Sequence, residues 1–168
     1  RDDVLAAVVT CAGRVGLRRI TVDEVAREAG VARASVYRWF PGGREQLVDE
    51  AITWEIGRFL GRLAEAVDDS PDLRTRLIRA LTFAHRAIAE HDVLQHLLVT
   101  EPGGLLPQLQ QTAPLVIAVM RDALVEHVEA EPRRRSEVDP VEASEWLARM
   151  VVSFVMEQGR WDLDDTDD

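Results

Sequence analysis

The chain has 168 residues, and 46% of them are hydrophobic, which is enough for one large domain or for a small domain on a larger one. No apolar run reaches the roughly 18 residues that a membrane-spanning helix needs, so we expect no membrane partner. No secretory leader pattern is found, and the single cysteine, Cys11, excludes an internal disulfide framework. These features favour a cytoplasmic protein.

The formal net charge of -10 argues at first against a protein that binds nucleic acid. The charge is unevenly distributed, however, because residues 1–50 hold eight Arg and eight acidic residues and are therefore balanced. The other 118 residues hold twelve Arg and twenty-two acidic residues, which accounts for the whole deficit. Since phosphates repel the acidic part, any contact with DNA is expected within the first 50 residues.

Apolar residues recur at helical spacing nearly throughout the chain, and no alternating pattern is long enough for a strand. The sequence therefore predicts an all-α fold. Gly16 stands where a left-handed C-terminal cap would end the first helix, and Thr21 and Glu24 have the spacing of a capping box. The predicted helices cover residues 2–15, 21–30, 33–39, 44–68, 70–88, 93–100, 115–130 and 140–159.

Prolines and glycines interrupt this helical pattern. The run at 41–43 ends the third helix before a long helix begins. The run at 102–104 is expected to end the helix at 93–100, and Pro107 and Pro114 to bracket an irregular stretch.

The strongest local signal lies in residues 21–40, which are typical of two short helices joined by a tight turn. Two helices can cross closely only where a small residue lies at their contact and the turn accepts a positive φ angle. Ala26 is the small residue, Gly30 the turn, and Val36 the apolar contact from the second helix. The other apolar residues at the contact between the two helices, here called the seam, are Val22, Val25 and Val31.

The second helix of this pair exposes side chains suited to the major groove of DNA. Arg can read guanine with two hydrogen bonds, hydroxyl groups meet bases or phosphates, and small residues permit close approach. An ordinary helical hairpin could share the Ala-x-x-x-Gly spacing, so the flanking segments are needed to discriminate between the two interpretations. The exposed set is Arg33, Ala34, Ser35, Tyr37 and Arg38.

Residues 2–50 resemble the head of the TetR family of transcriptional regulators. The resemblance implies a helix-turn-helix DNA-binding domain over residues 1–45, with the helix at 33–39 in the major groove. It also implies a long helix leading into an antiparallel helical bundle, a ligand-binding and dimerisation domain over residues 46–168. It rests on the first helix, Gly16-Leu17, Thr21, the helical pair, the run Tyr37–Pro41 and the new helix start at Arg44.

Carried over by position, the resemblance assigns phosphate contacts to Thr21, Tyr37 and Arg44. Ala32 departs from the family pattern, because it replaces the usual hydroxylated cap and should cost about 1 kcal/mol of capping free energy. Trp39 stands where His is common, and it can pack or donate one hydrogen bond at the DNA surface. Gly42-Gly43 replace a frequent Ser-Lys pair.

The resemblance further implies a homodimer, a near-palindromic operator, and a small-molecule effector in each body that releases the DNA. Apolar residues cover more than one face of the last helix, so each could serve the core or the subunit contact. The dimer-interface candidates are Leu147, Val151, Phe154 and Val155. Mostly apolar pocket walls predict a mostly apolar or aromatic effector. The pocket candidates, each of which could equally be core, are Trp54, Phe59, Phe83, His96, Leu97, Met120, Trp146 and Met150.

The histidines do not predict a metal or acid-base site. On one helix His85 and His91 would differ by about 240°, and His91 and His96 by about 140°, so their side chains diverge. The sequence has no His-Glu-x-x-His motif, no paired cysteines and no glycine-rich phosphate loop. We therefore expect no metal, no cofactor and no enzymatic activity.

Two functions remain open from the sequence. A TetR-type regulator, by family habit a repressor, explains the helical pair, the charge distribution and the two-part layout. The alternative is a helical regulator or interaction module whose body binds a protein partner rather than a small molecule. Replacing Arg33 or Arg38 by Ala should lower specific DNA affinity only if the helix at 33–39 reads DNA.

Overall fold

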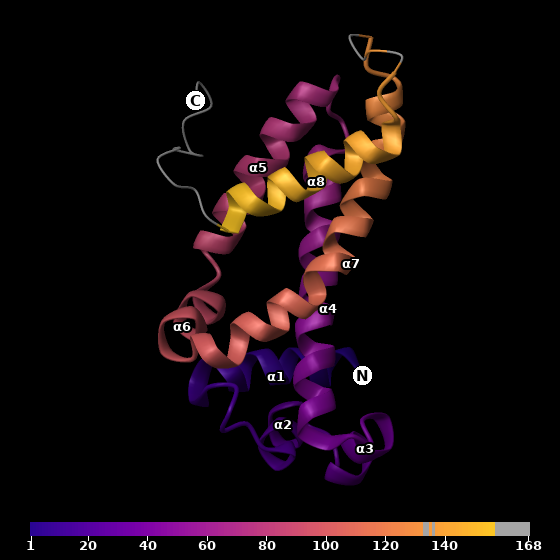
Figure 1. Ribbon diagram of the computed structural model, residues 1–168. Coiled ribbons are helices and arrows are strands. Elements are labelled where there is room, and N and C mark those ends of the chain that lie inside the picture. The colour runs from indigo at the N-terminus through magenta and orange to yellow at the C-terminus, as the bar shows by residue number, and fades with distance from the viewer. Residues whose placement is uncertain (133–134, 136, 157–168) are drawn as a thin grey trace. The chain divides into compact units, whose positions relative to one another are not determined.

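The computed structural model describes residues 1–132, 135 and 137–156, which form eight helices and no strand (Figure 1). The all-α prediction is confirmed. The helices are α1 (Asp2–Val15), α2 (Val22–Glu28), α3 (Arg33–Trp39), α4 (Gly43–Val67), α5 (Leu73–Ala89), α6 (Asp92–Thr100), α7 (Pro102–Glu129) and α8 (Pro140–Met156).

The chain forms two compact units. The first consists of Arg1–Phe59 with Ile88–Thr112, and the second of Leu60–Ala87 with the chain from Ala113 onward. Both α4 and α7 therefore contribute to each unit. The functional division after residue 45 stays a prediction, since packing alone does not test it.

The ends of α1 and α2 follow the predicted local signals. Gly16 has a φ angle of 84°, and its N–H donates to the carbonyl of Ala12 at 2.9 Å. Thr21 Oγ1 accepts the backbone N–H of Glu24 at 3.2 Å, while the Glu24 carboxylate accepts the backbone N–H of Thr21 at 3.1 Å. Both halves of the capping box are therefore present, and the prediction is confirmed.

The core of the first unit is formed where α1 contacts α2 and α6 and where α2 contacts α3 (Figure 1). Its largest fully buried side chain is Phe40, which follows α3 directly. The approach of α6 to α1 is close, because a Cβ on Gly13 would lie 2.8 Å from Val93 Cγ2. Other buried members are Val4, Val8, Cys11, Ile20, Val25, Val36, Leu47 and Leu97.

The start of α6 uses a histidine that the sequence left without a role. His91 Nδ1 accepts the backbone N–H of Leu94 at 3.2 Å and so caps the first turn. On its other side, His91 Nε2 lies 3.7 Å from Glu55 Oε1. This capping bond begins the helix at Asp92, one residue earlier than predicted.

The expected irregular stretch between residues 100 and 115 is wrong. One helix of 28 residues runs without interruption over Pro102–Glu129. Pro102 lies at its first position, where a missing N–H breaks no helical bond. Pro107 and Pro114 lie inside the helix, at a cost of about 3 kcal/mol each. The remaining helical bonds and the burial of apolar side chains outweigh that cost, and those side chains are Leu105, Leu124 and Val128.

The second unit has a core of aliphatic and small side chains. Asp72 Oδ1 accepts the backbone N–H of Thr75 at 2.7 Å, which caps α5 just after Pro71. The segment 70–72 therefore opens that helix as expected, although Pro71 precedes its first turn. The buried apolar residues are Leu63, Val67, Ala80, Ala84, Leu124, Val128, Ala148 and Val151.

Candidate DNA-binding surface

The turn between α2 and α3 has the geometry that the sequence predicts. Gly30 adopts a φ angle of 67°, a left-handed conformation that favours glycine. The backbone N–H of Val31 donates to the carbonyl of Ala26 at 3.0 Å, which closes the turn. Ala26 and Val36 are both buried at the crossing, so the predicted seam is confirmed.

One face of α3 is buried and the opposite face is exposed. Val36 is fully buried, whereas Arg33, Ala34 and Arg38 are exposed and the Tyr37 side chain is 40% exposed. Ser35 and Trp39 are half-buried. The first turn begins at Ala32, which offers no side-chain cap, as expected from its chemistry.

Arg33 is held at the start of α3 by two neighbours. Its Nη1 donates to the Asp23 carboxylate, with both oxygens 3.0 Å away. Its Nη2 makes a longer contact of 3.4 Å with the hydroxyl of Tyr37, and its Cζ lies 5.4 Å from the centre of that ring. The bond to Tyr37 and the charge of Asp23 raise the pKa of Arg33 above its usual value, which keeps the group cationic.

Arg38, five residues after Arg33, is oriented by an aromatic side chain. Its Cζ lies 5.8 Å from the centre of the Trp39 ring, within the range of a cation–π contact. Trp39 also packs against the core of the first unit. Trp39, which stands where many family members have His, thus packs inward and contacts the exposed Arg38.

The three predicted phosphate-binding residues have partners within the chain. The hydroxyl of Thr21 donates to Glu24 Oε2 at 2.8 Å, and Tyr37 contacts Arg33. Arg44 is half-buried, and its Nη2 donates to the carbonyl of Leu17 at 2.8 Å. Its Nε is buried without a hydrogen-bond partner in the described part of the chain. Arg44 therefore connects the start of α4 to the loop after α1.

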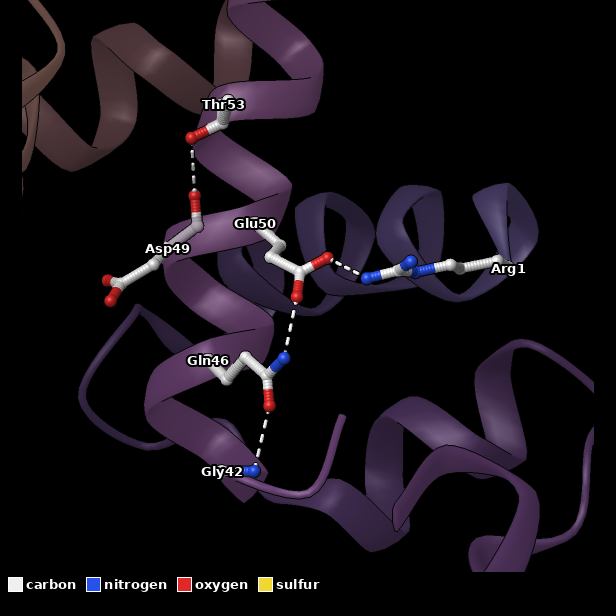
Figure 2. A network of polar contacts seen from close by, with 6 residues as sticks. All are labelled: Arg1, Gly42, Gln46, Asp49, Glu50 and Thr53. Atoms are coloured by element: carbon white, nitrogen blue, oxygen red, sulfur yellow. Dashed lines mark hydrogen bonds and ion pairs between the residues drawn. The ribbon is translucent and has the colours of Figure 1, made fainter. Parts of the chain in front are cut away.

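A chain of polar contacts fixes the turn between α3 and α4 (Figure 2). Gln46 Oε1 accepts the backbone N–H of Gly42 at 2.7 Å, and Gln46 Nε2 donates to Glu50 Oε1 at 2.7 Å. Glu50 in turn forms an ion pair with Arg1, whose Cζ lies 4.9 Å from the centre of the Phe40 ring. The N-terminal end of α1 is thereby connected to the end of α3.

Sequence reasoning did not find two of the residues that shape this surface, Asp23 and Gln46. Asp23 precedes its partner by ten residues across a turn, a separation that no helical period predicts. Gln46 lies four residues after Gly42, and its side chain bonds back to the backbone at the helix start. A search for Ser, Thr, Asp or Asn at the cap position overlooks this signal.

A tight helical pair with arginines on the exposed face of its second helix defines the helix-turn-helix class of DNA-binding domains. Residues 4–51 match the family model described as "Bacterial regulatory proteins, tetR family". These residues are therefore similar to the N-terminal DNA-binding domain of the TetR family of transcriptional regulators.

Known relatives agree in sequence and in fold. The HTH-type transcriptional repressor KstR2 of Rhodococcus jostii is 30% identical over 117 residues, which are 65% of this chain and 57% of the relative. The match thus spans less than two thirds of that protein.

Two solved structures share the fold, at identities too low to show more. The fatty acid degradation regulator FadR from Bacillus halodurans has a TM-score of 0.62 and 21% identity, over 96% of this chain and 87% of that one. FadR from Bacillus subtilis in complex with stearoyl-CoA has a TM-score of 0.61 and 18% identity, over 96% and 90%.

The predicted pocket residues are divided between the two units. Trp54, Phe59, His96 and Leu97 belong to the first, where His96 is exposed and Leu97 is buried in the core. The second unit contains the other four, with Phe83, Met120 and Met150 half-buried and Trp146 61% exposed.

An open hollow of about 400 Å³ in the first unit includes one pocket candidate, Trp54. Its lining is rich in carboxylates, from Asp2, Asp49 and Glu50. Figure 2 shows Asp49 and Glu50 on neighbouring positions of α4, with Thr53 donating to the Asp49 carbonyl at 3.0 Å. The lining also includes Leu5 and Arg1, and Arg1 forms an ion pair with Glu50.

The predicted dimer residues lie on α8 with different exposures. Val151 is buried, and Leu147 and Phe154 are half-buried. The side chain of Val155 lies outside the described residues. The exposed apolar side chains of α8 include Val141 and Trp146.

Within the described ranges, no group of three or more His, Cys, Asp or Glu side chains is arranged to hold a metal ion. No helix in that part of the chain is both long enough and apolar enough to cross a membrane.

Proposed function

We propose that the chain is a transcriptional repressor that binds a near-palindromic operator as a homodimer and is released by a mostly apolar small molecule. The observation that carries the DNA-binding part is α3, which buries Val36 and exposes Arg33, Tyr37 and Arg38. Exposed arginine and hydroxyl side chains on a short helix suit a major groove. The name of the relative KstR2 supports repression as the direction of control.

The phosphate contacts would come from Thr21, Tyr37 and Arg44. Thr21 is the residue before α2, Tyr37 lies on α3 and Arg44 lies in the first turn of α4. To bind phosphate, Arg44 would exchange its bond to the Leu17 carbonyl for a charged acceptor, which is a stronger partner. Binding should therefore weaken steeply as the salt concentration rises.

The effector would bind in the second unit, where Phe83, Met120 and Met150 are half-buried. The hydroxyl of Ser144, which is fully buried, and Nδ1 of His127 have no hydrogen-bond partner among the residues described. Such groups favour a mostly apolar ligand that carries one polar group. The Bacillus subtilis regulator is in complex with stearoyl-CoA, whose stearoyl chain is an apolar group of that kind.

The dimer contact would use the exposed apolar side chains of α8, Val141 and Trp146, with Leu147 and Phe154 beside them. Two copies would present their α3 helices to successive major grooves about 34 Å apart. This spacing makes a near-palindromic operator the expected target.

The test is a fluorescence-anisotropy titration of the purified chain against a randomised duplex pool at two salt concentrations, followed by sequencing of the bound fraction. The proposal expects enrichment of a palindrome and binding that weakens steeply with salt. A pool that stays unenriched at low salt contradicts the DNA-binding part. Stearoyl-CoA added to the enriched duplex then tests release, with CoA alone as the matched control for its polar half.

A further inference from the structure

We propose that Asp23 is a positioning residue for DNA reading, which holds Arg33 so that one edge of its guanidinium meets a base. The inference rests on the proposed function and adds a specificity determinant from α2, the helix that precedes the reading helix. Asp23 is exposed and lies in the first turn of α2, on the side where Arg33 leaves α3.

The geometry divides the donors of Arg33 into two sets. Nη1 lies 3.0 Å from both oxygens of Asp23, so a single nitrogen of Arg33 contacts both carboxylate oxygens. The Nε–Nη2 edge is on the other side of the group, where the one contact of Nη2 among the described residues is at 3.4 Å to the Tyr37 hydroxyl. This edge is therefore the less engaged of the two. Two neighbouring N–H groups on one edge are what bidentate reading of guanine O6 and N7 requires.

Tyr37 restricts the remaining freedom of the group. The Cζ of Arg33 lies 5.4 Å from the centre of the Tyr37 ring, which limits rotation of the guanidinium about the Asp23 bond. A carboxylate at one end and an aromatic ring at one face together fix the plane in which the Nε–Nη2 edge points. The two N–H groups of the Nε–Nη2 edge are therefore held in a fixed orientation before DNA binds.

The charge of Asp23 makes this role distinguishable from simple attraction. A carboxylate beside the DNA-binding helix repels phosphates, so it lowers affinity for DNA of any sequence. Its ion pair with Arg33 is also exposed on both sides, at 59% for Arg33 and 52% for Asp23. Exposed pairs contribute little to folding. Orientation of Arg33 is therefore the effect by which Asp23 can favour binding.

The experiment measures discrimination, which is the ratio of the dissociation constants for a scrambled duplex and for the duplex that the unmodified chain enriches. Asp23→Asn should bind the scrambled duplex at least as tightly as the unmodified chain, because a repulsive charge is lost. Its discrimination should fall about fivefold or more, as expected when one base is no longer read well. In repeated selections, base preference should weaken at one position of each half-site.

Four further variants make the result specific. Asp92→Asn removes the same charge from the first turn of α6, and it should leave discrimination unchanged. Asp23→Glu keeps the carboxylate and should restore most of the discrimination. Arg33→Ala should lose discrimination by itself, and adding Asp23→Asn to it should change the ratio no further, because the residue being positioned is gone.

The outcomes separate this inference from the proposed function. If the unmodified chain enriches a palindrome and Asp23→Asn keeps full discrimination, the positioning role is wrong while the proposed function stands. The positioning role is also wrong if the two substitutions act additively. If the unmodified chain enriches no sequence, the proposed function fails and the positioning role fails with it. Thermal unfolding of each variant confirms that a folded protein was compared.

Discussion

The side chain of Gln46 accepts the backbone N–H of Gly42 at 2.7 Å and takes the place of a conventional cap at the start of α4. The fit is close, because a Cβ on Gly42 would lie 3.0 Å from the Cβ of Gln46. Gly43 follows with a φ angle of 65°. The turn that follows α3 therefore depends on a glutamine and two glycines, where many family members have Ser-Lys.

Replacing Gln46 by Ala should lower the free energy of unfolding by about 1 kcal/mol, since a capping bond and a bond to Glu50 are lost together. Chemical denaturation followed by circular dichroism measures the change. Gln110→Ala is the matched control, because Gln110 is exposed on α7. Equal effects in the two variants would show that the contacts of Gln46 contribute nothing.

Replacing Ala32 by Ser should raise the free energy of unfolding by about 1 kcal/mol, because the new hydroxyl can cap the first turn of α3. Ala32 already has the extended backbone of a cap residue, with φ -68° and ψ 138°, so no rearrangement is needed. Ala34→Ser, inside the same helix, should give no gain. A stabilisation of equal size in both variants would contradict the capping explanation.

Replacing Gly16 by Ala should destabilise the chain by roughly 1–3 kcal/mol, since φ is +84° there and the new Cβ would lie 2.1 Å from Glu101 Oε1. Glu101 Oε2 also accepts the backbone N–H of Arg18 at 3.2 Å. A double-mutant cycle with Glu101→Ala measures the coupling by chemical denaturation. The losses of stability in the two single variants should sum to more than the loss in the double variant, because the clash with the new Cβ disappears when Glu101 is replaced. Strict additivity of the two losses would exclude that clash.

The pKa of Glu24 lies below its usual range, because the Thr21 hydroxyl and backbone N–H both donate to its carboxylate. A lowered pKa in the folded state adds stability above the unfolded pKa of about 4.3, and this stability is lost as the pH falls through the folded value. Glu24→Gln should therefore lose more stability at pH 7 than at pH 3. Denaturation at both values measures this, and an equal loss at both would contradict the linkage.

Replacing Arg38 by Ala should weaken binding to the enriched duplex by about 1–3 kcal/mol and relax the preference at one base of each half-site. Arg62→Ala provides the charge-matched control, since Arg62 is exposed in the second unit. Anisotropy titrations at constant salt compare the two. A uniform loss for all duplexes would instead identify Arg38 as a phosphate contact.

The sequence predicted the parts of the first unit that depend on short-range signals. Gly16, the Thr21–Glu24 pair and the contact of Ala26 with Val36 each act within ten residues, where φ preference, side-chain reach and helical period decide the structure. The limits of α1 and α3 follow from these signals directly.

Features that depend on contacts distant in sequence could not be predicted in the same way. Arg44 finds its acceptor on Leu17, 27 residues earlier. Periodicity places Leu97 and Trp146 on apolar faces alike, yet the first is buried in the core of its unit and the second is largely exposed. The prolines of α7 give the same local signal as prolines at helix ends, although a long helix can accommodate them.

Cys11 gives the first unit a reporter of its own opening. It is the one cysteine in the sequence, it is fully buried on α1, and burial raises the pKa of its thiol. A thiol reagent therefore reaches Cys11 only when the packing of α1 is disrupted. The labelling rate of the unmodified chain reports the free energy of that opening. A duplex that binds only the closed unit lowers the population of the open unit, and the labelling rate falls by the same factor. Operator binding can thus be followed on the protein side, without a dye on either molecule.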